Sequence, residues 1–198
     1  MAGTRAPRES FAEKRERRAA VDDPAVVLEA AARFLEVRSR SVSEVRRRLG
    51  GAGYRTDLVE GAIARMTELG MLDDEVFARA WVESRDRARP RGERAIREEL
   101  RLKGIDRETV DVVLGERRDR AGEPGSAADD GEDVAPASAD RTAAERLLAK
   151  NARALARVAD PRKRRQRAYA LLARHGFDPE TCRDVAATLT DAPDDGSA

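Results

Sequence analysis

The chain has 198 residues, of which 39% are charged and only 4% are aromatic. Seven aromatic residues cannot fill one large globular core, but they can serve several small helical units that each bury one face on a neighbour. A single cysteine excludes an internal disulfide and a cysteine-based metal cluster, and no apolar run approaches the roughly 18 residues that a membrane span needs.

The net charge of +1 conceals a strong segregation of charge along the chain. Residues 121–140 carry six acids and no base, which leaves 39 bases and 32 acids elsewhere. The remainder of the chain is therefore basic, and 35 of its bases are arginines, whose planar group can make paired contacts to phosphates and carboxylates.

The N-terminal residues 1–22 are charged and alanine-rich and show no helical face, which predicts a flexible charged arm. Charges stand where a signal peptide needs its apolar region, so the sequence favours a cytoplasmic location. A first helical repeat is expected over 23–72, with Asp23-Pro24 starting its first helix. Its second helix opens with a capping box that runs from Ser41 to Glu44.

A second repeat is expected over 73–120, beginning at Asp73-Asp74, where the helix dipole favours negative charge. The apolar face predicted for its first helix consists of Val76, Phe77, Ala80, Trp81 and Ser84.

An acidic segment rich in Gly, Ala, Pro and Ser follows at 121–141, and its composition predicts a disordered linker. A third repeat is expected over 142–191, opened by a capping box from Thr142 to Glu145, with an acidic tail at 192–198.

The three repeats superimpose at Gly53, Gly104 and Gly176. A leucine lies four residues before each glycine, and a bulky apolar side chain follows it directly. These spacings indicate two helices joined at a glycine corner in every repeat. With no stretch of strand-like alternation, the sequence predicts an all-α fold of three tandem three-helix repeats in an elongated array.

The sequence offers few residues for catalysis. His175, the only histidine, precedes the Gly176 corner and suits the end of a helix, whereas Cys182 occupies a repeat position taken elsewhere by valine, which indicates a core residue. The Asp73-Asp74 pair is interpreted as capping rather than as paired catalytic carboxylates. Zinc-ligand spacing and phosphate-binding glycine motifs are also absent from the sequence, so no enzyme activity, cofactor or metal is expected.

Basic clusters recur at the junction between the first and second helices of each repeat and extend along the second helix in the first two repeats. A solvated surface explains any one of them, but recurrence in register predicts a basic strip that attracts nucleic acid or an acidic protein groove. The candidate binding residues are Arg46, Arg47, Arg85, Arg87, Arg89, Arg91, Arg94, Arg97, Arg162, Lys163, Arg164 and Arg165.

The run LDDEVFARAWVESRDRARPRGERAIREELRLKGID resembles the signature of the RecX family of recombination regulators. The resemblance is close over about residues 26–120, extends in layout to 142–190, and departs from the family in the long acidic linker. The residues that carry it are Asp73, Asp74, Phe77, Trp81, Arg85, Gly92, Leu100 and Gly104.

The resemblance implies a curved, monomeric, non-enzymatic protein that lies in the groove of the RecA filament on DNA. It implies that the chain reduces the ATPase, strand-exchange and coprotease activities of RecA, in DNA repair, recombination and the SOS response. DNA would be contacted weakly or through the filament. The alternative is a helical regulator that binds DNA directly without a filament partner.

Overall fold

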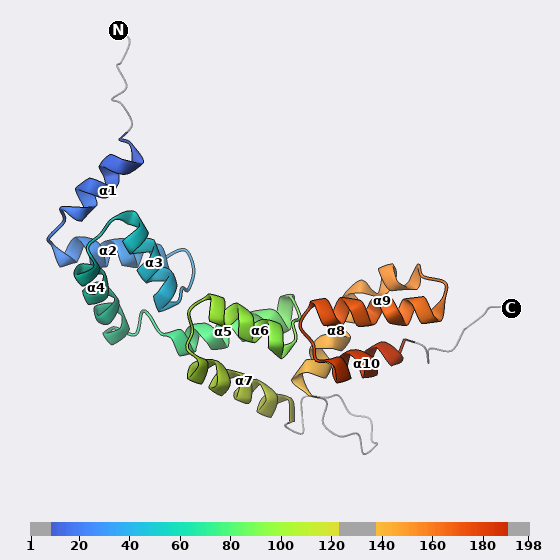
Figure 1. Cartoon of the computed structure of the whole chain (residues 1–198). Coiled ribbons are helices and arrows are strands. Elements are labelled where there is room, and N and C mark those ends of the chain that lie inside the picture. The colour runs from blue at the N-terminus through green and yellow to red at the C-terminus, as the bar shows by residue number, and fades with distance from the viewer. Residues whose placement is uncertain (1–8, 123–137, 190–198) are drawn as a thin grey trace, which may run out of the picture. The chain divides into compact units, whose positions relative to one another are not determined.

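A computed structural model describes residues 9–122 and 138–189, and every regular element within these ranges is an α-helix (Figure 1). The nine helices expected from the sequence are present, three to a repeat, together with one further helix at the N-terminus. The helices are α1 (Phe11–Ala19), α2 (Pro24–Leu35), α3 (Val42–Ala52), α4 (Thr56–Glu68), α5 (Asp74–Ala88), α6 (Glu93–Leu102), α7 (Arg107–Gly122), α8 (Ala139–Ala156), α9 (Pro161–Arg174) and α10 (Pro179–Ala187).

Side-chain caps set most of the helix starts. Ser41 accepts a hydrogen bond from the Glu44 amide at 3.1 Å, and the Glu44 carboxylate accepts one from the Ser41 amide, as the capping box predicts. Asp23, Asp160 and Asp178 each cap a helix that begins with proline, whose missing amide hydrogen would be unpaired there anyway.

Helix α1 differs from the flexible arm expected over residues 1–22. Ser10 accepts from the Glu13 amide and Glu13 accepts from the Ser10 amide, so a capping box opens a helix of nine residues. Although α1 buries no side chain fully, Arg18 is half-buried and lies against repeat 1. Residues 1–8 of the expected arm lie outside the described residues.

The boundaries of the acidic linker also differ from those expected. Helix α7 continues to Gly122, and α8 begins at Ala139 with Ser138 as its cap, so Thr142 lies inside the helix and opens nothing. Residues 123–137 of the expected linker lie outside the described residues. The expected acidic tail also lies outside them, within 190–198.

The chain divides into two compact units. The first comprises the chain as far as Phe77 together with Lys103–Ile105, and the second comprises Ala78–Leu102 and the chain from Asp106 onward. The core of repeat 1 lies in the first unit and contains Val27, Ala31, Val45, Leu49, Val59, Ala62, Ile63, Met66 and Leu72. The core of repeat 3 lies in the second and contains Ala143, Ala144, Leu147, Leu148, Leu155, Ala168, Leu172, Phe177, Cys182, Val185 and Ala186.

The buried face of α5 is rotated relative to the predicted face. Phe77, Ala78 and Val82 are buried, whereas Val76 is 59% exposed and Ala80 and Ser84 are exposed as well. Trp81 is half-buried, because its indole lies at the border of the core, where its polar edge reaches a carboxylate.

Within the first unit, the glycine corner of repeat 2 is joined to the start of α3 by two hydrogen bonds. The Ser41 hydroxyl donates to the Lys103 carbonyl oxygen at 2.6 Å, and the Val42 amide donates to Asp74 at 2.9 Å. Gly104 has φ 80° and lies so close to α3 that an added Cβ would stand 2.3 Å from the Ser43 Cβ. Close backbone approach therefore requires glycine at this corner.

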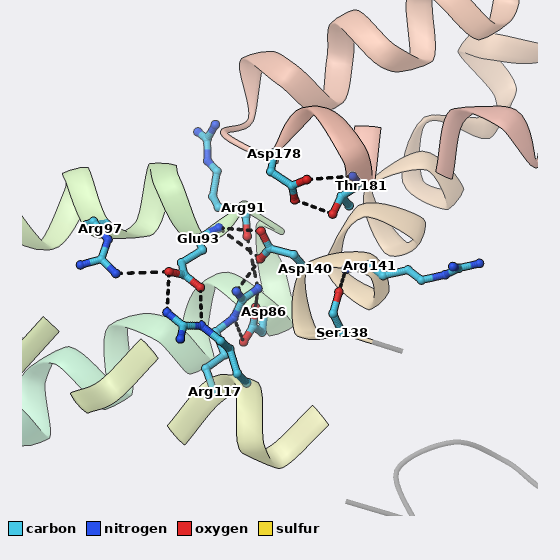
Figure 2. A network of polar contacts seen from close by, with 11 residues as sticks. Asp86, Arg91, Glu93, Arg97, Arg117, Ser138, Asp140, Arg141, Asp178 and Thr181 are labelled. Atoms are coloured by element: carbon cyan, nitrogen blue, oxygen red, sulfur yellow. Dashed lines mark hydrogen bonds and ion pairs between the residues drawn. The ribbon is translucent and has the colours of Figure 1, made fainter. Parts of the chain in front are cut away.

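Within the second unit, the corner of repeat 3 is joined to the start of α6 in the same way. The Gly92 amide donates to the His175 carbonyl oxygen at 3.0 Å, and the Glu93 amide donates to the Asp140 carboxylate at 3.0 Å and 3.1 Å (Figure 2). A Cβ on Gly176 would stand 2.4 Å from the Ala95 Cβ. We call these two sets of contacts the repeat joints.

Each joint uses an acid from the first helix of the following repeat. Asp73 caps its own helix, as expected, by accepting from the Glu75 and Val76 amides at 2.8 Å and 2.9 Å. Its neighbour Asp74 instead accepts from Val42. Of the two adjacent acids, Asp73 therefore caps its helix and Asp74 connects repeat 2 to the start of α3.

Arg117 stabilises the second joint by binding its acid, Asp140. Its side chain is only 3% exposed and donates to Asp140 at 2.6 Å and to Asp86 at 3.0 Å (Figure 2). Burial works to lower the pKa of Arg117, but the hydrogen bonds and charges of the two carboxylates outweigh burial and raise that pKa. The guanidinium thus fixes the acid that the joint needs.

The corner of repeat 1 rests on α1 in a corresponding manner. The carbonyl oxygen of Ala52, directly before Gly53, accepts from the Arg18 guanidinium at 3.3 Å. The Arg18 guanidinium also lies 5.7 Å from the centre of the Tyr54 ring. In all three repeats, the carbonyl oxygen before the corner glycine therefore accepts a hydrogen bond from a segment that lies before that repeat in the chain. For repeat 1 this segment is α1.

Candidate polyanion-binding surface

The candidate strip of repeat 2 does not consist of equivalent arginines. Arg85 stacks on Trp81, with its guanidinium carbon 4.2 Å from the ring centre, and pairs with Glu99 at 2.5 Å. The Trp81 indole donates to the same carboxylate at 2.8 Å. Since its side chain is 17% exposed and engaged on two sides, Arg85 serves the packing of repeat 2.

Two further members of the strip are engaged by carboxylates. Arg97 pairs with Glu93 at 3.2 Å and also with Asp111, and these bonds raise its pKa, with the hydrogen bond to Asp111 as the largest cause. Arg91 lies 3.7 Å from Glu99, a looser contact.

The remaining members of the strip are exposed and form no ion pair with any described residue. They lie at the end of α5 and on the first turn of α6, and they are Arg87, Arg89 and Arg94. In repeat 1 the candidates divide similarly, because Arg46 pairs with Glu60 at 2.6 Å whereas Arg47 is exposed without an ion partner in the described chain.

Repeat 3 carries the largest excess of basic side chains. Residues 146–174 contain ten lysines and arginines and a single acid, Asp160. Asp160 caps α9 by accepting hydrogen bonds from the Arg162 and Lys163 amides. Its carboxylate forms no ion pair with a described residue. Of the predicted cluster, Arg162, Lys163 and Arg165 are exposed, while Arg164 is half-buried and donates to the Val158 carbonyl oxygen.

A basic stripe along α8 was not among the binding residues predicted from the sequence. Arg146, Lys150, Arg153 and Arg157 are spaced four, three and four residues apart, which places them on one helical face, and all four are exposed. The spacing is visible in the sequence, but the predicted binding residues were taken from the junctions between helices and not from the faces of the helices. The stripe and the exposed cations that start α9 both belong to the second unit, and we call these residues together the repeat-3 basic surface.

The residues that the sequence excluded from catalysis have structural roles. Cys182 is fully buried, and burial raises the pKa of its thiol. His175 ends α9, and its Nδ1 lies 2.8 Å from the Leu171 carbonyl oxygen. Among the described residues, no group of acids, cysteines and histidines has the geometry of a metal site, and no helix is long and apolar enough to cross a membrane.

Three domain profiles of one protein family match the chain in order. They describe the first, second and third three-helix domains of RecX and match residues 28–66, 73–114 and 139–185, respectively. These matches coincide with the three repeats that the structure resolves around the glycine corners.

Curated relatives named "Regulatory protein RecX" are similar over most of their length. The protein of Mycolicibacterium vanbaalenii is 33% identical over 159 residues, which cover 77% of this chain and 76% of the relative. The protein of Mycobacterium leprae is 33% identical over 158 residues, which cover 79% and 82%.

Solved structures share the fold. The crystal structure of RecX from Lactobacillus salivarius matches with a TM-score of 0.66 at 19% identity, over 85% of this chain and 97% of the other. A further crystal structure of a regulatory protein RecX matches with a TM-score of 0.64 at 19% identity, over 83% and 71%. From its profiles, its relatives and its repeat architecture, the chain belongs to the RecX family of regulatory proteins.

Proposed function

We propose that this protein binds the filament that the RecA recombinase forms on DNA and inhibits its ATPase, strand-exchange and coprotease activities. Its action is regulatory and requires no chemistry of its own. The observation that carries the proposal, beyond family membership, is the repeat-3 basic surface, whose exposed cations form no ion pair with any residue that the structure describes. Such a surface attracts a polyanion such as a nucleoprotein filament.

The second candidate function is direct binding to DNA without a filament partner. The same unpaired cations favour it, because lysines and arginines that neutralise phosphates release counterions and give salt-dependent affinity. Affinity separates the two functions. Much tighter binding to the RecA filament than to bare DNA supports filament regulation, whereas equal affinity supports the DNA-binding alternative.

The test is a titration of the protein into DNA-dependent ATP hydrolysis by RecA. We expect inhibition by the parent and a marked loss of inhibition when Arg153, Arg157, Arg162 and Lys163 are all changed to Ala. We also expect the dependence of filament affinity on salt to become flatter, since each lost phosphate contact removes part of the slope. A parent protein that never alters RecA activity would contradict the proposal.

A matched control removes four other positive charges. Arg33, Arg65, Arg101 and Arg141 are exposed and lie in short-range ion pairs within their own helices. Such pairs contribute only about 0–1 kcal/mol, so their change to Ala should leave the fold and the inhibition nearly intact. Equal loss of inhibition in both quadruple variants would mean that net charge matters and that the repeat-3 basic surface does not.

A third variant tests the exposed members of the strip in repeat 2. Changing Arg87, Arg89 and Arg94 to Ala should weaken inhibition without unfolding, because none of the three forms an ion pair with a described residue. Unchanged inhibition would restrict the binding surface to repeat 3.

A further inference from the structure

A hollow in the second unit lies between the end of α5 and repeat 3. Its volume is about 240 Å³, several times the roughly 30 Å³ that one water molecule occupies in the liquid. Its wall contains three cations and the only histidine of the chain: Arg89, Arg91, Lys150 and His175. Ala88, Pro90, Leu147 and Asn151 complete the lining, so no carboxylate belongs to it.

A second hollow of this unit differs because it contains a carboxylate. Asp86 lines it together with Arg117, Arg120 and Arg146, and Arg117 is already bound by two carboxylates. An anion there would meet a fixed negative charge in the wall, whereas the wall of the first hollow contains no carboxylate and the nearest ion pair is the loose contact of Arg91 with Glu99 at 3.7 Å.

Several donors around the first hollow remain available. The Lys150 ammonium donates one hydrogen bond, to the Ala88 carbonyl oxygen at 2.8 Å, and an ammonium has three hydrogens. The His175 ring must hold a hydrogen on Nδ1 toward the Leu171 carbonyl oxygen, so its Nε2 donates to an anion when the ring carries a second proton. Arg89 is exposed and forms no ion pair with a described residue.

The walls of the hollow are held in place by the second repeat joint. The Gly92 amide bonds the His175 carbonyl oxygen, which couples the segment of Arg89 and Arg91 to the end of α9. The bond from Lys150 to Ala88 couples the same segment to α8. The cations of two segments and the histidine ring of a third are therefore gathered before a ligand arrives, which reduces the entropic cost of binding.

We propose that this hollow binds a single phosphate group. Cations from two segments, with a histidine ring from a third, suit the several directions of a tetrahedral anion better than the flat face of a carboxylate, and arginine provides two parallel donors to such a group. The phosphate comes either from a DNA backbone or from a terminal or unattached phosphate. The first source deepens the proposed function, because it supplies a defined contact between this chain and filament DNA.

The single histidine gives a direct measurement on the full-length protein. At fixed pH, the ring signals of His175 would be followed by NMR while inorganic phosphate is added, with chloride of equal ionic strength as the reference. Separate titrations would use a short thymidine oligonucleotide with and without a 5′-phosphate. We expect a saturable shift with phosphate or with oligonucleotide, and none with chloride.

The oligonucleotides identify the source of the phosphate. Equal shifts with both oligonucleotides indicate an internal phosphodiester, whereas a shift only with inorganic phosphate or the 5′-phosphorylated strand indicates a terminal or unattached group. Either result supports the site. The absence of any saturable shift in all of these titrations would overturn it.

Paired variants separate the hollow from general charge. Arg89→Gln with Lys150→Gln removes two cations from the wall while keeping a donor at each position, and we expect the apparent phosphate affinity to fall at least tenfold. Arg101→Gln with Arg141→Gln removes the same charge from exposed positions outside both the lining and the repeat-3 basic surface and should change the phosphate affinity less than twofold. An equal loss in both pairs would overturn the proposal.

The outcome is independent of the regulatory assay. A protein that binds phosphate here but does not alter RecA-driven ATP hydrolysis would retain the site and lose the proposed function. A protein that inhibits RecA equally well with and without the two glutamines, and shows no phosphate shift, would retain the function and lose the site.

Discussion

At the scale of single residues, arginines that look alike in the sequence separate into structural and exposed classes. Arg85 is held between the Trp81 ring and Glu99, and Arg87, two residues later, is exposed. The sequence predicted both as binding residues because a linear pattern reveals neither the carboxylate fourteen residues away nor the aromatic face. Partners brought together by folding decide which cations remain for a ligand.

The first prediction separates these two classes. Arg85→Ala should lower the free energy of unfolding by about 1–3 kcal/mol, because it removes a partly buried ion pair and a cation–π contact. Arg87→Ala should change it by less than about 0.5 kcal/mol. Urea unfolding, followed by the fluorescence of Trp81, measures both variants. Equal stability of the two would contradict the assignment of Arg85 to the packing of repeat 2.

The second prediction concerns the glycine of the last corner. Gly176→Ala should lower the free energy of unfolding by about 2–5 kcal/mol, because a left-handed backbone costs about 1–2 kcal/mol and overpacking about 1–3 kcal/mol. Gly70 is the control, since its φ is also positive but nothing lies within 4 Å of an added Cβ. Gly70→Ala should therefore show only the backbone cost, and equal losses at both positions would exclude the crowding against Ala95.

At the scale of elements, local chemistry predicted the helices better than their contacts. Helix starts were readable where an acid precedes proline or where Ser41 and Glu44 form a capping box. The box at Ser10 and Glu13 was equally readable, but the absence of an apolar face argued against a helix there. Thr142 fitted the same pattern yet lies inside α8, because Ser138 offered an earlier cap.

The repeat joints could not be predicted from the sequence. Asp74 and Asp140 look like ordinary first-turn acids, and their partners are the amides of Val42 and Glu93, 32 and 47 residues away. In the sequence, the residues of the joints therefore look only like glycines and acids at the ends of helices.

The third prediction tests α1 as the element that covers the first corner. Arg18→Ala should lower the free energy of unfolding by about 0.5–1.5 kcal/mol, because it removes the donor to Ala52 and the contact with Tyr54. Arg17 pairs only with the exposed Glu9 and should contribute almost nothing. Thermal unfolding by circular dichroism compares the two. An Arg17 variant as unstable as the Arg18 variant would remove α1 from this role.

At the scale of the whole molecule, stability should depend on acid through the carboxylates that brace the joints. Burial works to raise the pKa of Glu44, but the bonds from Lys103 and Arg38 outweigh it and hold that pKa below its usual 4.5. The hydrogen bond from Arg118 is the main cause of a lowered pKa at Glu93. Both side chains therefore bind protons less readily when folded than when unfolded.

The fourth prediction follows from the sign of these shifts. A carboxylate with a depressed pKa contributes stability that is complete above its unfolded value and is lost as pH falls through its folded value. The thermal midpoint should therefore decline as pH is lowered from about 4.5. Glu44→Gln and Glu93→Gln should each make the decline shallower, and a midpoint independent of pH in this range would contradict both assignments.

The first residue of α9 limits how the array can grow. Val42 and Glu93 each offer an amide hydrogen to an acid of the next repeat, but the corresponding first residue of α9 is Pro161, which has none to offer. A gene duplication that appended a fourth repeat after the third would thus find one bond of the joint missing. Repeat 2, by contrast, has the groups for a joint on either side. Asp74 and the Lys103 carbonyl oxygen accept in the joint with repeat 1, and the Gly92 and Glu93 amides donate in the joint with repeat 3. Protein engineers could therefore lengthen the array by inserting further copies of repeat 2 between repeats 1 and 3.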